Sequence, residues 1–206
     1  EAKLFQVPKE ATLSWKTSSL KKKMPKLKLP GWNALILAMM FEDSQPGSHW
    51  RTYLDILPKS LNTPIFWTPS QLELLKGASI VDHIGAAKIK KDYEKVIVPL
   101  LSRAEFYTVP EAEREAIKTE YFSLQQYMRF GSLIMAYSFT YDDGDIAMVP
   151  MADMLNHKTG HNNARLYFDQ EDDTLVDADV KTAKETEGAK PTKKAKVSEN
   201  TFLHMR

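Results

Sequence analysis

Asp153, Asn156 and His157 carry carboxylate, amide and imidazole groups within a short segment, residues 148–157, whose other side chains are mostly apolar. Buried polar groups in proteins nearly always have hydrogen-bond partners. An apolar segment with three such groups therefore predicts one of two things. It is either a structural hydrogen-bond network that ties loops together or a ligand site.

A metal site is the first form of ligand site to test against this spacing. Asp153, His157 and His161 recur every four residues, so on a helix they would share one face and could bind a metal ion. Gly160 and the pair Asn162–Asn163 disfavour a continuous helix through this stretch. We therefore expect no metal site, and a metal-dependent hydrolase that uses these three side chains stays as an alternative with only the spacing behind it.

This segment lies in a chain of 206 residues. That length indicates one domain, or one domain with an appendage. The apolar fraction of 43% is enough for a sizeable core. A net charge of +1 gives no general argument for nucleic acid or a membrane as a partner, and we expect neither. Because the chain has no cysteine, disulfides and cysteine nucleophiles are excluded, which fits an intracellular protein.

The middle of the chain, residues 32–137, is predicted to be mostly helical. Residues 32–41 are apolar on nearly every face, as in a helix that is buried all round. Thr68–Pro69 is a good helix start, and Gly77 is a good helix end. The predicted helices cover residues 32–41, 50–57, 71–76, 80–101 and 108–130, with a further apolar segment at 133–139. An interruption of the helix at 80–101 near Pro99 stays as an alternative.

Short strands are predicted on both sides of these helices. Residues 4–8 and 11–13 have strand character before them, and residues 164–168 and 174–176 have it after them, joined by an acidic turn. Residues 21–28 are lysine-rich and contain proline, which is typical of a solvated loop. From Lys181 onward the chain has seven basic and three acidic residues and few apolar ones. We therefore expect a disordered basic tail over residues 179–206.

Residues 148–157 also carry a resemblance to a known family. Pro150-Met151-Ala152-Asp153-Met154-Leu155-Asn156-His157 resembles the P-x-A-D-x-x-N-H signature of SET-domain protein lysine methyltransferases, in the branch similar to Rubisco large-subunit methyltransferase. Further segments resemble that branch in the same order. They are residues 4–8, 32–42, 50–54, 57–58, 64–67 and 135–139.

The resemblance implies an α+β fold, in which a SET-domain core of short strands is interrupted by a large helical insert. We expect a partial SET domain over residues 1–178, with the insert at about 31–137. The implied cofactor is S-adenosylmethionine. By resemblance, Tyr137, Asn156 and His157 would bind this cofactor, while Trp67 and Thr140 would lie close to the substrate.

The implied reaction needs no metal and no protein nucleophile, but it needs a neutral lysine amine. A lysine with its ordinary pKa near 10.4 costs roughly 4–5 kcal/mol to deprotonate at neutral pH. Burial in an aromatic-lined channel lowers that pKa and so reduces the cost. Tyr137 and Trp67 are side chains of a suitable kind for such a channel, because they exclude water and can face a cation.

The chain departs from the family at both ends. It lacks the glycine-rich cofactor segment ahead of the first strand, and it also lacks the later G-E-x-x-x-x-Y-G segment whose tyrosine is usually assigned the catalytic role. No catalytic residue is therefore assigned. We expect weak or no methyl transfer by this chain alone.

Two functional hypotheses stand ahead of the metal-dependent hydrolase. The first is an S-adenosylmethionine-dependent protein-lysine N-methyltransferase that acts on a ribosomal or transcription-related protein. The second is a catalytically inactive, truncated SET-like module that binds another protein through its helices. Residues 190–196 resemble a nuclear-import signal, so we expect a nuclear location, with the cytoplasm as the alternative. Cofactor binding would discriminate the two hypotheses.

Overall fold

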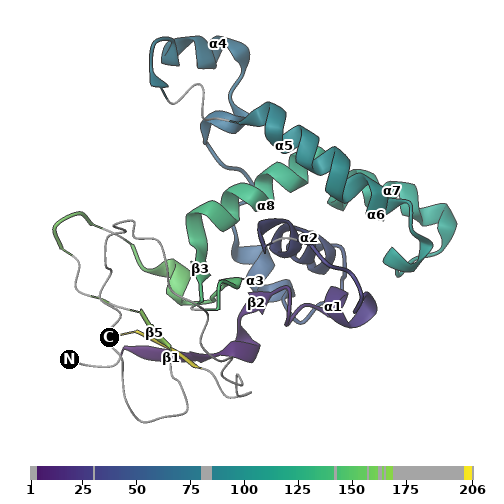
Figure 1. Cartoon of the computed structure of the whole chain (residues 1–206), viewed down its shortest axis with the longest axis horizontal. Coiled ribbons are helices and arrows are strands. Elements are labelled where there is room, and N and C mark those ends of the chain that lie inside the picture. The colour runs from purple at the N-terminus through teal and green to yellow at the C-terminus, as the bar shows by residue number, and fades with distance from the viewer. Residues whose placement is uncertain are drawn as a thin grey trace, which may run out of the picture. The chain divides into compact units, whose positions relative to one another are not determined.

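The computed structural model describes residues 4–29, 31–79, 85–141, 143–156, 158–161, 164, 166–168 and 202–205. They belong to two compact units. Figure 1 labels the helices and strands. The larger unit comprises residues 13–149, and the smaller unit comprises residues 1–12 together with 150–206.

Helix α2 (Gly31–Asp43) is the centre of the larger unit. Its residues from Ala34 to Glu42 are buried, whereas Trp32 near its start is 45% exposed. Alanine, leucine and methionine dominate this stretch, and these residues favour helices. The prediction of a helix buried on nearly every face is therefore confirmed beyond its first turn.

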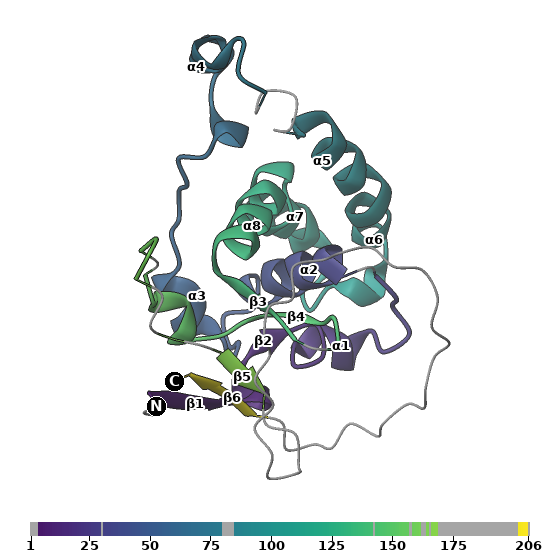
Figure 2. The same cartoon turned by 60° about the vertical axis from the view of Figure 1, so that its left-hand side comes forward.

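Helix α8 (Leu124–Tyr137) lies alongside α2 in both views of the chain (Figures 1 and 2). It begins after Ser123, whose hydroxyl accepts a hydrogen bond from the Gln126 backbone N–H at 3.4 Å. This N-cap separates α8 from α7 (Arg114–Tyr121). The prediction of one helix through to residue 130 was wrong, because the extended backbone of Ser123 interrupts it.

A long helical segment packs on the outside of these helices. It consists of α5 (Ala86–Asp92), a π-helical turn η5 (Tyr93–Ile97) and α6 (Val98–Leu101). In the π-turn the Val98 N–H donates to the carbonyl of Tyr93, five residues back. Pro99 follows directly; it has no N–H, and its ring crowds the carbonyl four residues earlier. The wider turn relieves this crowding, so the helix predicted over residues 80–101 continues past the proline. It begins only at Ala86, after Gly85 in the left-handed conformation, and residues 80–84 lie outside the described residues.

The short helices follow their capping signals. Helix α3 (Arg51–Ile56) ends just before Leu57–Pro58, as predicted. Before α4 (Pro69–Leu72), Thr68 and Gln71 form a reciprocal capping box, and the following 3₁₀ turn η3 (Glu73–Leu75) ends before Gly77, which has φ +88°. The lysine-rich stretch was wrongly predicted to be all loop. Ser18 caps a short helix there, α1 (Ser19–Lys23).

A small antiparallel sheet completes the larger unit. Its order is β2 (Leu13–Ser14), β4 (Ile146–Met148) and β3 (Ser138–Thr140). In the β3–β4 register Ser138 lies opposite Met148 and Thr140 lies opposite Ile146. The strand predicted at 11–13 begins later, because residues 9–11 form the 3₁₀ turn η1 (Lys9–Ala11). The predicted apolar segment at 133–139 divides between the end of α8 and the start of β3.

The core of the larger unit is tightly packed around aromatic rings. Phe106 packs edge-on against Phe41 and Phe122, with ring centroids 5.6 and 4.9 Å apart. Such edge-to-face pairs add to the stabilisation that burial alone provides. None of the helices in the described ranges is both long enough and apolar enough to cross a membrane.

The smaller unit contains a second antiparallel sheet, in the order β1 (Phe5–Pro8), β6 (Phe202–Met205) and β5 (Leu166–Phe168). Strand β6 belongs to the predicted disordered tail, so that prediction was wrong for residues 202–205. The low apolar content of the whole tail concealed a local apolar run that completes the sheet. The rest of the tail and the predicted strand at 174–176 lie outside the described residues.

Helices with small antiparallel sheets give an α+β fold. The helices α2 to α8 occupy residues 31–137, with short strands before and after them in sequence. That this segment is the helical insert, and that the partial SET domain covers residues 1–178, stay predictions.

Candidate functional site

The predicted signature begins with a sharp turn. Met151 has φ 75° and ψ −40°, and it is the one non-glycine residue with positive φ in the described part of the chain. The 3₁₀ turn η8 (Ala152–Met154) follows, and the Met154 N–H donates to the Met151 carbonyl at 3.3 Å. A side-chain-bearing residue in such a conformation costs on the order of 1–3 kcal/mol, and such residues cluster at functional sites.

The side chains of this turn are more exposed than the sequence suggested. Met151, Met154 and Leu155 are 62%, 70% and 46% exposed. Asn156 is exposed too, while Asp153 is partly buried. The expectation that this segment buries its polar groups was therefore wrong for Asn156. The turn instead presents an accessible amide beside apolar surface, which suits a ligand that has both polar and apolar parts.

The structure does not decide whether Asp153, His157 and His161 form a metal site. His157 lies outside the described residues, and His161 is exposed. Across the described ranges, no three His, Cys, Asp or Glu side chains gather as a metal ion would require. The expectation of no metal site stays a prediction, since one of the three side chains in question is not described.

Tyr137 is the last residue of α8 and is partly buried against the core of the larger unit. The next residue, Ser138, donates its N–H to the Ile134 carbonyl and starts β3. The phenol therefore lies where a packed helix changes into a strand, on a backbone that is fixed on both sides. A binding group benefits from such rigid support.

Thr140 lies at the other end of β3 and is exposed. The loop after it is held by two backbone hydrogen bonds, Tyr141 N–H to Asp145 O at 2.8 Å and Gly144 N–H to Tyr141 O at 2.9 Å. Lys16 pairs with the carboxylates of Asp145 and Asp143. Burial works against the Lys16 cation, but these two carboxylates outweigh it and raise the pKa of Lys16. The loop is thus tied to the N-terminal part of the unit.

Trp67 comes from a different stretch, just after the 3₁₀ turn η2 (Pro64–Phe66). Its indole Nε1–H donates to the Asn62 side-chain oxygen at 2.9 Å, and its ring is partly buried. The structure therefore places Tyr137 just before β3, Thr140 at the end of β3, and Trp67 on a separate loop of the same unit. Asn156 belongs to the smaller unit.

Sequence reasoning did not find the backbone conformation of Met151. Positive φ is usually signalled by glycine or asparagine, and the sequence there offers neither. It also missed a cluster of charged side chains at the end of α2, because its members are spread between residues 43 and 129.

The chain is similar to known proteins over more than three quarters of its length. No family model matches the chain. It is 32% identical over 183 residues to the N-lysine methyltransferase setd6 of Danio rerio, covering 77% of this chain and 38% of that protein. It is 28% identical to the ribosomal lysine N-methyltransferase 4 of Saccharomyces cerevisiae, covering 81% of this chain and 38% of that protein. The chain therefore spans less than two fifths of the length of these relatives.

The solved structures agree on the fold. The SET domain of LSMT bound to lysine and AdoHcy superposes with a TM-score of 0.59 at 23% identity, over 77% of this chain and 35% of that one. Rubisco LSMT bound to AdoMet superposes with a TM-score of 0.57 at 23% identity over the same shares. At this level of identity the likeness establishes the fold alone.

Proposed function

The chain belongs to the SET-domain protein lysine methyltransferases, in the branch of Rubisco LSMT and setd6, and from this premise we propose that it is part of an S-adenosylmethionine-dependent protein-lysine N-methyltransferase. The observation that carries the proposal is the likeness to named lysine methyltransferases, which extends over more than three quarters of the chain.

The residues of the smaller unit fit one end of such a cofactor. S-adenosylmethionine, when bound, would supply an electrophilic methyl group. The exposed amide of Asn156 and the neighbouring backbone would hold the polar amino-acid end, while Met154 and Leu155 offer apolar surface beside it. His157 is proposed to bind the cofactor as well, from the family resemblance alone. The unusual φ of Met151 supports a specialised role for this turn.

The residues of the larger unit are proposed to act on the substrate lysine. Tyr137 would line the lysine channel and contact the cofactor, and Trp67 and Thr140 would contact the substrate protein. Excluding water around the lysine lowers the pKa of its ammonium group and so raises the fraction of neutral amine. Holding that amine in line with the methyl group would supply much of the remaining acceleration.

The substrate is proposed to be a protein, as the names of the relatives imply for those proteins. A ribosomal or transcription-related protein is the proposed class of substrate. The proposed location is the nucleus, supported by the basic run at residues 190–196, with the cytoplasm as the alternative.

Calorimetric titration with S-adenosylmethionine tests the cofactor assignment. We expect the chain to bind the cofactor and Asn156→Ala to abolish or greatly weaken binding. Gln125→Ala removes an exposed amide on α8 and should bind normally. If the folded chain does not bind S-adenosylmethionine at all, the protein-interaction module becomes the better hypothesis.

A further inference from the structure

A cavity of about 390 Å³ lies in the larger unit, away from all the residues assigned above. It is formed by the end of α2, by α3 and the residues after it, by the end of α7, and by the first turns of α8. Six charged side chains line it, three acidic and three basic. They are Asp43, Asp55, Glu120, Arg51, Lys59 and Arg129.

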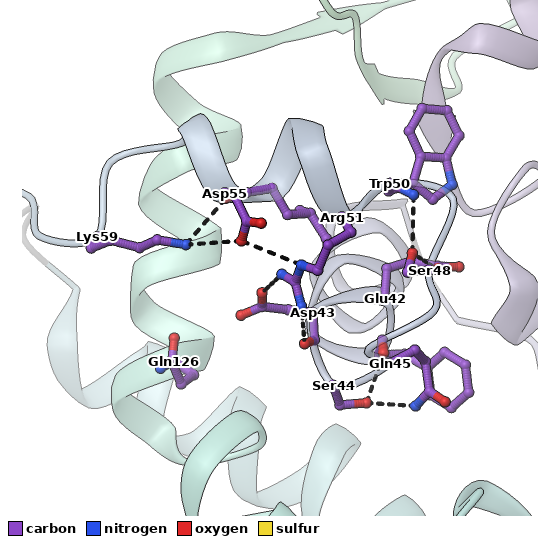
Figure 3. A network of polar contacts seen from close by, with 12 residues as sticks. Glu42, Asp43, Ser44, Gln45, Ser48, Trp50, Arg51, Asp55, Lys59 and Gln126 are labelled. Carbon is purple, nitrogen blue, oxygen red and sulfur yellow. Dashed lines mark hydrogen bonds and ion pairs between the residues drawn. The ribbon is translucent and has the colours of Figure 1, made fainter.

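Most of these charges are already paired with one another (Figure 3). Arg51 contacts the carboxylate of Asp43 and also donates from Nη1 to the Asp43 backbone carbonyl at 2.9 Å. The Asp55 Oδ1 atom lies 3.3 Å from Arg51 Nε and 3.8 Å from Lys59 Nζ. Arg51 thus joins the end of α2 to α3 on one wall of the cavity.

Arg129 is more buried than the other cations that line the cavity, and it is paired less directly. Its side chain is only 9% exposed, yet its ion pair with Asp43 Oδ2 is 3.8 Å long. Its guanidinium donates to two neutral acceptors, Pro58 O at 3.1 Å and the Gln126 side-chain oxygen at 3.3 Å, and it lies over the Phe130 ring, 4.6 Å from the centroid. Burial lowers the pKa of Arg129, and Asp43 offsets this only in part. A buried guanidinium with incomplete compensation favours a further negative charge beside it.

The other lining residues restrict what that negative charge can belong to. Asp55 is 57% exposed at the side chain, and Glu120 is exposed, so both present carboxylates at the surface of the cavity. A polyanion would be repelled by them, whereas a ligand that also carries a positive charge would be attracted. The volume lies near the lower end of the range of ligand pockets, which suits a few side chains rather than a folded element.

We propose that this cavity is a docking site for a mixed-charge segment of a partner protein. An aspartate or glutamate of that segment meets Arg129, and a neighbouring lysine or arginine meets Asp55 and Glu120. The site does not require methyl transfer, because an interaction module could use it equally well. Its failure is therefore distinguishable from a failure of the cofactor assignment.

The test uses capped peptides in place of the unidentified partner. Fluorescence anisotropy compares a labelled peptide of alternating glutamate and lysine with all-glutamate and all-lysine peptides of equal length. We expect the mixed peptide to bind most tightly and its affinity to fall as salt is added. If either single-charge peptide binds as tightly as the mixed one, or if the mixed peptide does not bind, the proposal is overturned.

Variants then locate the binding. Arg129→Gln should weaken binding of the mixed peptide by about tenfold or more, and the surface variant Glu120→Gln by about threefold. Glu113→Gln removes an exposed carboxylate outside the cavity and serves as the matched control. Should Arg129→Gln fail to fold, Glu120→Gln still decides the question. Equal affinity of Glu120→Gln and the control would rule out the cavity as the docking site.

Discussion

Met151 is strained by its backbone rather than by its surroundings. Its φ of 75° is unfavourable for any residue with a Cβ atom, and its side chain is 62% exposed, so little packing depends on the methionine itself. The strain must be maintained by the turn, in which the Met151 carbonyl accepts from the Met154 N–H.

The first prediction concerns this strain. Met151→Gly should stabilise the chain by about 1 kcal/mol, because relief of the positive φ exceeds the entropy that glycine adds to the unfolded state. Urea denaturation measures this as a higher midpoint. Met151→Ala keeps the Cβ atom and should show no gain. Equal midpoints for the glycine and alanine variants would mean that the turn stores no such strain.

Tyr107 provides a second prediction at this scale. Its hydroxyl donates to the Leu101 carbonyl at 2.6 Å, and burial raises the pKa of Tyr107 to about 12. The unfolded chain has a tyrosine pKa of about 10. The folded state therefore holds the proton more strongly. This contribution to stability is complete below pH 10 and is lost as the pH rises from about 10 to about 12.

Tyr107→Phe isolates that contribution. At neutral pH the variant should be less stable by about 1 kcal/mol, because the Leu101 carbonyl loses its donor. From about pH 10 to about pH 12 the difference in unfolding free energy between the two proteins should shrink, as wild type loses its advantage. Urea denaturation at several pH values measures this. Parallel stability curves over that range would contradict the assignment.

Some properties of the site residues could be predicted from the sequence, and others could not. The type and order of residues 150–157 were enough to indicate a family and a candidate cofactor site. The exposure of Asn156 could not be read in the same way, because an apolar segment can be buried or exposed depending on what packs against it. The sequence also could not show that the charge of Arg129 is only partly compensated, because its partners come from residues 43, 58 and 126.

At the scale of elements, the buried carboxylate of Glu42 connects α2 to the start of α1 and to the loop before α3. Glu42 is 1% exposed at the end of α2. Its Oε1 atom accepts hydrogen bonds from the Ser18 hydroxyl, the Ser19 hydroxyl and the Ser19 backbone N–H, at 2.6–2.8 Å. Its Oε2 atom accepts from the Ser48 hydroxyl at 2.5 Å. One side chain thus ties α1 and the loop before α3 to α2.

Glu42→Gln tests this connection and is the third prediction. The amide keeps the shape but loses the charge and places an N–H₂ donor among donors, so the chain should lose about 3 kcal/mol of stability. Thermal or urea unfolding measures the loss. Glu10→Gln, at an exposed position, should change stability by no more than about 0.5 kcal/mol. A loss no larger than that of this control would show that the hydrogen bonds contribute little.

The elements that the sequence predicted well share a local cause. Helix α2 follows from an apolar run, and α4 follows from the Thr68 cap with Gln71. The elements that it missed depend on competing or distant signals. The apolar pattern runs through Phe122 and conceals the Ser123 cap. The lysines of α1 read as loop because the carboxylate at their helix start comes from residue 42.

At the scale of the whole molecule, the two units differ in how far apart in the sequence their segments lie. The larger unit is one continuous stretch, residues 13–149, whose helices form from local patterns. The sheet of the smaller unit joins strands from opposite ends of the chain, with β6 hydrogen-bonded to both β1 and β5. Local patterns cannot reveal a pairing between Phe5 and Met205, which explains why β6 was missed.

The last prediction follows from that central position of β6. Removing residues 202–206 takes the middle strand out of the sheet, so the backbone groups of β1 and β5 lose their partners in the described pairing. Hydrogen exchange should then accelerate about tenfold or more at the backbone amides of Phe5–Val7, because β1 no longer has the hydrogen bonds to β6 that protect them. Exchange at Ala147 and Met148 in the larger unit should not change. Phe202→Val keeps a strand-forming side chain and should retain protection. If β1 exchanges equally slowly without β6, the smaller unit does not rely on this strand, and its order must come from residues elsewhere in the unit.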